Sequence, residues 1–480
     1  MPTSPSDAPR PGGGPGYDLA VIGAGPAGLA AAVTAADLGL RCALLDAAAH
    51  TGGQFYRHPA PGLGAARPGR LHHGWSAYTG LADRLTAHRG AGRVDLLGSH
   101  QVWALERVGE TAWAVHATLG PGADDRATVR AGGVLLATGA YERQLPFPGW
   151  TLPGVVTAGG AQAMLKSGLV LPGRRIVVAG SGPLLLAAAS SLVAAGAVVP
   201  AVVEATDYLG YARRPHVLAA VPAKLAEGVV HGTAFLRHRV RLRRRAAVVE
   251  AHGTDRVTAV TVAGLDARWR PVPGTEKRIE CDAVAVGHGL LPQIELATEA
   301  GAETVAGPDG AVALKVDAGL RTTVPGLWAA GETCGVGGAD LAIAEGELAA
   351  YAVAGAAPRG PARRRRARLR AFADLMAAAH RPGPGWTGWL RPDTDVCRCE
   401  EVPAAAITEA VEELGAGDAR TVKLLTRAGM GWCQGRMCGP AVACLSGASG
   451  EPRADSRPLS CPVPLAQLAA ETAGPAGDGA

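Results

Sequence analysis

The sequence predicts an α/β fold in which two Rossmann-like domains are followed by a small, mainly helical C-terminal domain. Residues 17–47 and residues 173–205 each read as an apolar strand, a glycine-rich turn, an alanine-rich helix and a second strand. After residue 393, four cysteines come in two close pairs that flank short helical stretches. Strand–turn–helix–strand units build parallel sheets with the glycine turn at the carboxyl edge, so the chain should contain two such sheets.

The composition is that of a globular protein with two or three cores. The chain has 480 residues, of which 48% are apolar and 19% are charged. No run of about eighteen apolar residues occurs, and no N-terminal signal pattern is visible, so neither a membrane span nor a signal peptide is expected. Five of the nine cysteines show no spacing pattern, which favours reduced thiols and a cytoplasmic location. The arginine run at 363–370 is interpreted as the solvated face of a linker helix, and no nucleic-acid partner is expected.

The first glycine turn, in YDLAVIGAGPAGLAAAVTAADLGLRCALLDA (17–47), predicts a dinucleotide site. Gly23 permits the tight turn, Gly25 lets the backbone approach a pyrophosphate, and Gly28 lets the helix pack closely on the strand. The start of the helix then faces the phosphates. Asp46 ends the second strand, where a carboxylate accepts hydrogen bonds from ribose hydroxyls. The candidate residues are Gly23, Gly25, Pro26, Ala27, Gly28 and Asp46.

The second unit, GRRIVVAGSGPLLLAAASSLVAAGAVVPAVVEA (173–205), has a damaged turn. Gly180 and Gly182 are present, but Leu185 stands where the third glycine belongs. A leucine there should hold the helix and strand apart or force a different packing. Glu204 ends the second strand and is placed to bind a ribose. Gly180, Gly182 and Glu204 are therefore a candidate NAD(P) site, with a vestigial domain or a site for another nucleotide as the alternatives.

The four late cysteines, Cys397-x-Cys399 and Cys433-x4-Cys438, are candidate metal ligands. Four thiolates can bind zinc, ligate an iron–sulfur cluster or form two disulfides. Disulfides rank last, because nothing places the chain in an oxidising compartment. Zinc pairs are usually separated by two to four residues, so a CxC start fits zinc less well. An iron–sulfur cluster is favoured and zinc stays open.

No catalytic residue is assigned from the sequence. Cys42 and Cys281 are single cysteines, so a disulfide reductase is disfavoured. No Ser/His/Asp or paired-carboxylate arrangement stands out. His288, in VGHGLLP, is interpreted as a packing or flavin-side residue and not as a general base.

Three further segments indicate which dinucleotide binds. TGGQFYR (51–57), GGVLLATGAYERQLPFPG (132–149) and TTVPGLWAAGE (322–332) together resemble the two-dinucleotide-binding-domain flavoproteins. In that resemblance all three segments converge on FAD, and Glu332, where the family more often has aspartate, bonds the ribityl chain. The segment 335–338 should open a helix whose amides stabilise negative charge on the reduced flavin. The resemblance adds the candidate FAD contacts Gly52, Gly53, Gln54, Val102, Thr138, Gly139, Gly331, Glu332 and Gly338.

The cysteine segments, with RCEEV, TRAGMG and CQGRMCG around them, resemble the bacterioferritin-associated ferredoxin-like [2Fe-2S] domain. From residue 17 to about 470 the chain is similar to the FAD- and [2Fe-2S]-containing subunits of opine oxidase, D-hydroxyproline dehydrogenase and hydrogen cyanide synthase. This resemblance implies that a glycine-oxidase-like flavoprotein, the partner subunit, oxidises the C–N bond of an amino acid or opine while this chain relays electrons. It implies a hetero-oligomer, with a small ferredoxin-like subunit or a quinone as acceptor, and so a cytoplasmic protein that is peripheral to the membrane.

Two other functions stay open. An autonomous NAD(P)H dehydrogenase needs the turn at 180–204 to work despite its leucine. A structural zinc module that docks partners needs no electron traffic through the cysteines. The expected organisation is a disordered tail (1–16), a first FAD-binding part (17–150), an inserted NAD(P)-type domain (151–282), a second FAD-binding part (283–356), a helical linker (357–392), a [2Fe-2S] domain (393–450) and a C-terminal tail (451–480).

Overall fold

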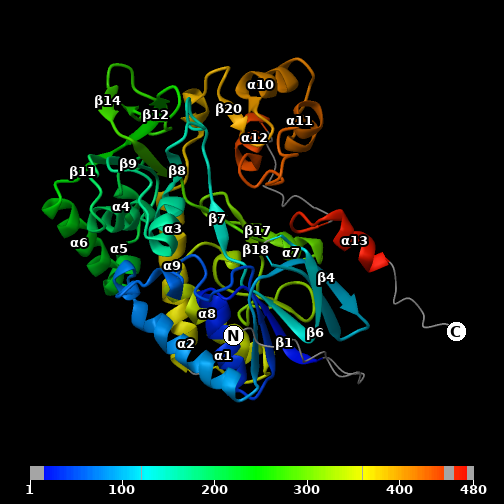
Figure 1. Ribbon diagram of the computed structural model, residues 1–480. Helices are drawn as coiled ribbons and strands as arrows, with labels where there is room; N and C mark the ends of the chain where they lie inside the picture. The colour runs from blue at the N-terminus through cyan, green and yellow to red at the C-terminus, as the bar shows by residue number, and fades with distance from the viewer. Residues whose placement is uncertain (1–15, 121, 359, 448–458, 473–480) are drawn as a thin grey trace.

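The computed structural model describes residues 16–120, 122–358, 360–447 and 459–472. The predicted N-terminal tail lies outside these ranges except for residue 16, and the predicted C-terminal tail is described only at 459–472. Two α/β bodies are joined by a pair of strands, and a small unit of helices lies at the C-terminal end (Figure 1). The predicted fold class, with two Rossmann-type sheets and a small third unit, is confirmed.

The first body carries the first glycine turn on a seven-stranded sheet. Its elements are β1 (Tyr17–Ile22), α1 (Pro26–Asp37), β2 (Cys42–Leu45), α2 (Trp75–Gly90), β3 (Val94–Leu97), β4 (His100–Val108), β5 (Ala112–Leu119), β6 (Asp125–Leu136), α7 (Glu295–Glu299), β17 (Thr304–Ala306), β18 (Val312–Leu314), β19 (Leu327–Ala329) and α8 (Ala339–Val353). The strand order is β3-β2-β1-β6-β5-β4, and β19 also pairs with β6. Small residues let α1 and α8 touch: a Cβ on Gly346 would lie 2.1 Å from the carbonyl oxygen of Ala27. The turn after β1 is therefore held between the sheet and two tightly packed helices.

The second body repeats the pattern on a five-stranded parallel sheet, ordered β11-β10-β9-β15-β8. Its parallel part contains β8 (Val155–Thr157), α3 (Ala158–Gly168), β9 (Ile176–Gly180), α4 (Leu184–Ala194), β10 (Ala201–Glu204), α5 (Pro215–Ala219), α6 (Pro222–Arg237), β11 (Arg241–Arg244) and β15 (Ala283–Gly287). An antiparallel sheet follows β11 and contains β12 (Ala246–His252), β13 (Ala259–Gly264) and β14 (Lys277–Glu280). The antiparallel strands β7 (Ala140–Glu142) and β16 (Leu290–Pro292) connect the two bodies.

The predicted linker helix is α9 (Gly360–Ala379), which runs from α8 past the second body towards the C-terminal unit (Figure 1). Its arginine run is not wholly solvated as predicted. Arg366 and Arg370 donate to the carboxylate of Glu345 at 3.0 and 2.8 Å, and Glu345 is completely buried in α8. A buried carboxylate requires such partners, so these two arginines attach the linker to the first body.

The C-terminal unit is a compact group of short elements around a small core. Its elements are β20 (Asp395–Cys397), β21 (Val402–Pro403), α10 (Ala404–Glu412), α11 (Ala419–Thr426) and α12 (Gly439–Leu445). The two short helical stretches predicted near the cysteines correspond to α10 and α11, and Cys397 ends the strand β20. Beyond it, α13 (Leu465–Thr472) returns to the first body, where Gln467 donates to the carbonyl oxygen of Asp124.

Within the described residues, no helix has both the length and the apolar character that crossing a membrane requires.

Candidate cofactor sites

Two of the three glycines in the first turn are required by the protein itself. A Cβ on Gly23, where φ is +103°, would lie 2.3 Å from the carbonyl oxygen of Ala137. A Cβ on Gly28 would lie 1.7 Å from the carbonyl oxygen of Gly23. Either contact is far too short, so a side chain at these positions forces strand and helix apart.

Gly25 differs, because nothing in the protein requires a glycine there. Its φ of −75° suits any residue, and the nearest atom to a Cβ would be the Cα of Gly53 at 3.8 Å. Gly53 faces it with φ of +58°, and a Cβ on Gly53 would lie 2.8 Å from the Cα of Gly25. Gly53 must therefore stay small to lie against Gly25, and the space beside Gly25 is open where a side chain would fill it. This space fits a pyrophosphate lying on the start of α1, so the residues present fit FAD.

The other segments expected around FAD meet at the same turn. The amide of Gly52 donates to the carbonyl oxygen of Ala24 at 2.8 Å. The backbone nitrogen of Thr138 lies 3.4 Å from where a Cβ on the first glycine of the turn would stand. A Cβ on Gly331 would lie 2.9 Å from that of Ala27 in α1. Segments far apart in the sequence are thus brought to one place by the sheet and by the packing of α1 on α8.

The two acidic residues expected at the FAD sugars both accept backbone hydrogen bonds. Asp46 accepts from the amides of Ala24 at 2.5 Å and Ala48 at 2.7 Å. Glu332 accepts from both amides of residues 337–338, at 3.0 and 2.9 Å. Burial raises the pKa of both carboxyl groups and the amides oppose that rise. The amides expected to face the flavin from the start of α8, including that of Gly338, are therefore bonded to Glu332.

Three expected contacts lie at the margin of this arrangement. The Gln54 side chain is exposed and its amide oxygen accepts from Arg57 at 2.7 Å. Gly139 has φ of +80° and no heavy atom within 4 Å of a Cβ. Val102 lies on β4 and is buried in the core cluster that includes Leu45. Their contacts to FAD remain predictions.

The second turn keeps its first glycine but differs in the rest. A Cβ on Gly180 would lie 1.7 Å from the carbonyl oxygen of the last residue of β15. Leu185 is completely buried between helix and sheet. The helix begins at Leu184, one position later in the motif than α1, and Gly182 takes a φ of +112° where Gly25 has −75°. A leucine at the third glycine position is thus accompanied by a different conformation of the turn, as the sequence predicted.

The acid of the second unit is enclosed by donors. Glu204 is completely buried and accepts from the amide of Gly182 at 3.1 Å, from the amide and hydroxyl of Thr206 at 3.0 Å each and from the hydroxyl of Tyr208 at 3.3 Å. Burial opposes its ionisation, but the nearby His380 and these amides outweigh burial and hold the pKa of Glu204 below its usual value. Glu204 is therefore a carboxylate whose partners all belong to the protein.

The two cysteine pairs come together across the C-terminal unit. Cys399 Sγ and Cys433 Sγ lie 3.7 Å apart, and Cys397 and Cys438 are buried in one small core. Two thiolates on one tetrahedral metal with bonds of about 2.3 Å lie about 3.8 Å apart, so Cys399 and Cys433 fit a single metal centre. Among the described residues, no group of three or more Cys, His, Asp or Glu is arranged around one ion. Ligands grouped in pairs suit a cluster of two irons better than one zinc.

Two glycines between the pairs shape the cysteine loops. The amide of Gly429 donates to Cys397 Sγ at 3.4 Å, and hydrogen bonds to ligating sulfur tune iron–sulfur sites. A Cβ on Gly431 would lie 2.3 Å from the Cβ of Cys399. The glycines of TRAGMG thus have physical reasons: Gly429 has φ of +89°, and Gly431 has no room for a side chain beside Cys399.

Arg436, between Cys433 and Cys438, was not predicted as a site residue from the sequence. Its Nε lies 2.8 Å from Glu295 Oε1, and the two side chains are only 15% and 11% exposed. It also donates to the carbonyl oxygens of Cys433 and Ser460. Glu295 begins α7 in the first body, so Arg436 attaches the cysteine loop to the body that carries the FAD turn. No local pattern could have shown a partner so far away in the chain.

His288 is a packing residue in this structure. It is 3% exposed, and its ring lies 5.9 Å from those of Trp269 and Trp389. Burial lowers the pKa of His288 to about 4, so the ring is neutral and weakly basic at physiological pH. This agrees with the interpretation that it is not a general base.

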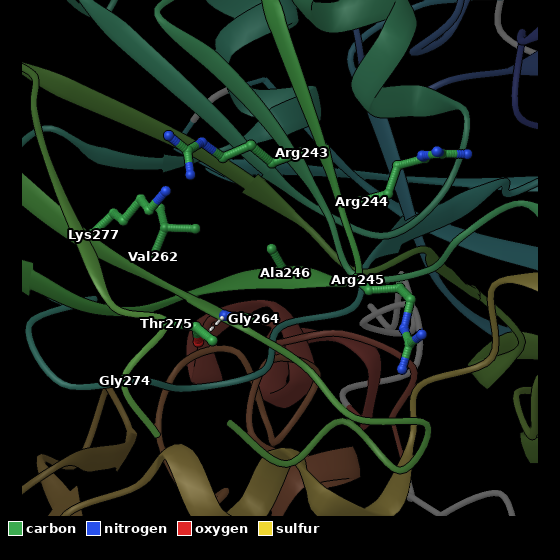
Figure 2. Close-up of a pocket in the computed structure, with 9 residues that line it drawn as sticks. All are labelled: Arg243, Arg244, Arg245, Ala246, Val262, Gly264, Gly274, Thr275 and Lys277. Carbon is green, nitrogen blue, oxygen red and sulfur yellow. Dashed lines mark hydrogen bonds between the residues drawn. The ribbon is translucent and has the colours of Figure 1, made fainter. Parts of the chain in front are cut away.

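A hollow of about 480 Å³ lies beside β11 and β14 in the second body (Figure 2). Four cationic residues, Arg243, Arg244, Arg245 and Lys277, contribute to its lining. Figure 2 shows the three arginine side chains pointing in different directions, so they do not converge on one ligand position. None of the predicted site residues lines this hollow.

Comparison with known proteins agrees with both cofactor sites. Residues 17–356 match the family described as pyridine nucleotide-disulphide oxidoreductase, and residues 396–445 match the BFD-like [2Fe-2S] binding domain. Hydrogen cyanide synthase subunit HcnB of Pseudomonas aeruginosa is 35% identical over 87% of this chain and 90% of its own length. An opine oxidase subunit of Agrobacterium tumefaciens is 35% identical over 89% of this chain and 84% of its own. The L-proline dehydrogenase structure from P. horikoshii shares the fold, with a TM-score of 0.66 at 19% identity over 94% of this chain and 79% of that one.

The chain belongs to the pyridine nucleotide-disulphide oxidoreductase family and, within it, to the group that includes these hydrogen cyanide synthase and opine oxidase subunits. The predicted resemblance and the predicted cofactors, FAD and a [2Fe-2S] cluster, are confirmed. The protein is a flavin-dependent oxidoreductase with an iron–sulfur domain.

Proposed function

We propose that this chain is the electron-relaying subunit of a multi-subunit amino-acid, imino-acid or opine dehydrogenase. In this proposal a glycine-oxidase-like flavoprotein subunit oxidises the C–N bond, and a small ferredoxin-like subunit or a quinone takes the electrons onward. Relatives named as subunits of hydrogen cyanide synthase and of opine oxidase support a hetero-oligomer. When bound, FAD exchanges electrons in pairs and a [2Fe-2S] cluster exchanges them singly.

The observation that carries the proposal is the rigid attachment of the cysteine unit to both α/β bodies. Arg436 pairs with Glu295 of the first body at 2.8 Å. Arg391, at the end of the linker just before β20, makes a bidentate ion pair with Glu250 of the second body, at 2.8 and 2.7 Å. Trp150 Nε1 donates to the carbonyl oxygen of Asp395, at the start of β20, at 2.6 Å. A metal site held in this way keeps one position relative to the FAD turn, which supports electron transfer between two cofactors on one chain.

The proposed site residues fall into two groups, one that would bind FAD and one that would bind the iron–sulfur cluster. Gly25 and Gly53 leave room for the FAD pyrophosphate, and the start of α1 presents amides to it. Cys397 and Cys438 supply buried thiolates, while Cys399 lies exposed at the surface of the unit. Cluster binding requires all four sulfurs to be deprotonated, because thiolates are the ligands. His288, the buried histidine considered as a base, is neutral and enclosed, which fits substrate oxidation on another subunit.

The test uses the complex with its partner subunit, obtained by co-expression of the neighbouring coding sequences. With Cys399→Ser in this chain, iron and acid-labile sulfide should be lost, and anaerobic electron transfer from substrate to a dye acceptor should slow at least about tenfold. Cys444→Ser, which changes an exposed cysteine outside the pairs, is the matched control and should behave as wild type.

Three results would contradict the proposal. Stoichiometric zinc without iron in anaerobically purified protein would favour a structural docking module. Fast reduction of the flavin by NADH in the lone subunit would favour an autonomous NAD(P)H dehydrogenase. Unchanged transfer after confirmed loss of the cluster would remove the relay.

A further inference from the structure

The place where a dinucleotide would lie in the second body is filled by the protein's own linker. In doubly wound sheets, ligands bind outside the carboxyl ends of the parallel strands, over the glycine turn. At this position in the second body the chain returns as α9 ends, and His380, the next residue, lies against Ser181 in the turn. His380 is only 7% exposed.

Both ring nitrogens and the carbonyl oxygen of His380 are held by residues of the second unit. Its Nδ1 lies 3.1 Å from the hydroxyl of Thr206 and 3.5 Å from a carboxylate oxygen of Glu204. Its Nε2 lies 3.1 Å from the hydroxyl of Tyr211. The hydroxyl of Ser181 donates to its carbonyl oxygen at 3.2 Å. A buried imidazole with this many partners is fixed in place and not a side chain resting over an open site.

The groups that a dinucleotide needs are occupied as well. The Gly182 amide, which would face the pyrophosphate, donates to Glu204 instead. Both oxygens of Glu204 accept hydrogen bonds from Thr206 and Tyr208, so the carboxylate is enclosed where a ribose would need it. A dinucleotide would have to displace His380 and leave these buried groups unpaired, which is costly in a low-dielectric site.

The end of the linker also packs closely on the segment that follows β10. A Cβ on Gly210 would lie 2.8 Å from the Cβ of Ala379, so this position must stay small. The rings of Tyr211 and Phe372, which belongs to α9, are stacked at 6.5 Å. The helix that leads to the cysteine unit therefore ends in a fitted contact with the second body.

We propose that the crevice of the second body is a socket for the linker, that His380 occupies it in place of NAD(P), and that this contact fixes the linker leading to the iron–sulfur domain. A fold usually used to bind a dinucleotide thus serves here to position a domain. The inference does not depend on the proposed electron relay, since it concerns only contacts within the chain.

The test compares the full-length, FAD-loaded wild type with His380→Ala by hydrogen–deuterium exchange. Segments 204–211 and 376–390 should exchange about tenfold faster in the variant, because the buried hydrogen bonds that join them are lost. His238→Ala, an exposed histidine on the same body, is the matched control and should leave both segments unchanged. Flavin absorbance should stay at the wild-type level, which separates loss of the socket from general unfolding.

Tyr211→Phe, which removes only the hydroxyl that bonds His380, keeps the test decisive if His380→Ala folds poorly. It should speed exchange in the same two segments by a smaller factor. Wild type should show no saturable calorimetric binding of NADH or NADPH up to about 1 mM. Unchanged exchange in both variants would overturn the anchoring role. Saturable binding of either dinucleotide to wild type, abolished by Glu204→Gln, would overturn the exclusion.

Discussion

Replacing Gly25 with valine should abolish FAD binding and leave the protein folded, whereas Gly28→Ala should destabilise the fold itself. Both residues belong to the same turn, and a sequence motif treats them alike. The structure separates them, because a Cβ on Gly28 would lie 1.7 Å from a carbonyl oxygen and a Cβ on Gly25 would have its nearest neighbour at 3.8 Å. The protein itself thus leaves room for a side chain at position 25, and only a ligand bound in front of the turn would exclude one.

The expected magnitudes follow from these distances. Overpacking at Gly28 should cost about 1–3 kcal/mol or more, since the obstacle is backbone and cannot rotate away. At Gly25 the loss of a good N-cap, about 0.5–1 kcal/mol, is offset by the reduced entropy of the unfolded chain, about 0.4–1 kcal/mol. The free energy of unfolding of the apo-protein should therefore change by no more than about 0.5 kcal/mol in Gly25→Ala. Valine is used in the binding assay because its larger side chain blocks the FAD site more completely.

The assay is denaturant unfolding with and without added FAD, together with the flavin absorbance of the purified protein. Wild type should gain about 2.7 kcal/mol at a hundredfold excess of FAD over its Kd, and Gly25→Val should gain almost nothing. Gly28→Ala should unfold earlier in both conditions. A yellow, fully flavinylated Gly25→Val protein would refute the assignment of this turn to the FAD pyrophosphate.

Two further predictions concern Lys166, on α3 of the second body, and Gly431, which lies beside Cys399. Lys166 is buried without a carboxylate partner among its described contacts, and burial lowers its pKa to about 8 from 10.5. Lys166→Met should therefore stabilise the protein by up to about 3 kcal/mol at pH 7. Wild type should regain that difference as pH rises from about 8 to about 10.5, which urea unfolding across this range would show or exclude. Gly431→Ala should displace Cys399 and lose the visible cluster spectrum although every cysteine remains, while Gly417→Ala, which has open space around it, should keep the spectrum.

The parts of the fold that the sequence predicted are those set by local chemistry. The two strand–turn–helix units appear where the glycines and apolar runs placed them, because a tight turn and a close helix need glycine at fixed intervals. Leu185 predicted an altered second turn, because it replaces a glycine that close packing of helix on strand requires. The cysteine pairs were likewise readable from spacing alone, because the members of each pair are separated by only one or four residues.

Some details of the sites could not be read from the sequence. The carboxylate of Glu332 accepts hydrogen bonds from the amides that open α8, which no motif indicated, and its bond to the ribityl chain stays a prediction. The arginine run was interpreted as a solvated face, yet Arg366 and Arg370 pair with the buried Glu345. In each case the sequence motif identifies the residue. Its hydrogen-bond or ion-pair partner depends on which polar groups become buried and lose their contact with water.

The sequence by itself determined the two glycine turns and the spacing of the two cysteine pairs, because each depends on residues within one short segment. Only the tertiary structure decided that His380 lies against Ser181, 199 positions earlier, and that Arg436 pairs with Glu295 on the other side of the linker. Such contacts have no spacing signal, since they form where separately folded surfaces meet and buried polar groups must find partners. The use of the second turn therefore depends on what packs against it, and not on its glycines.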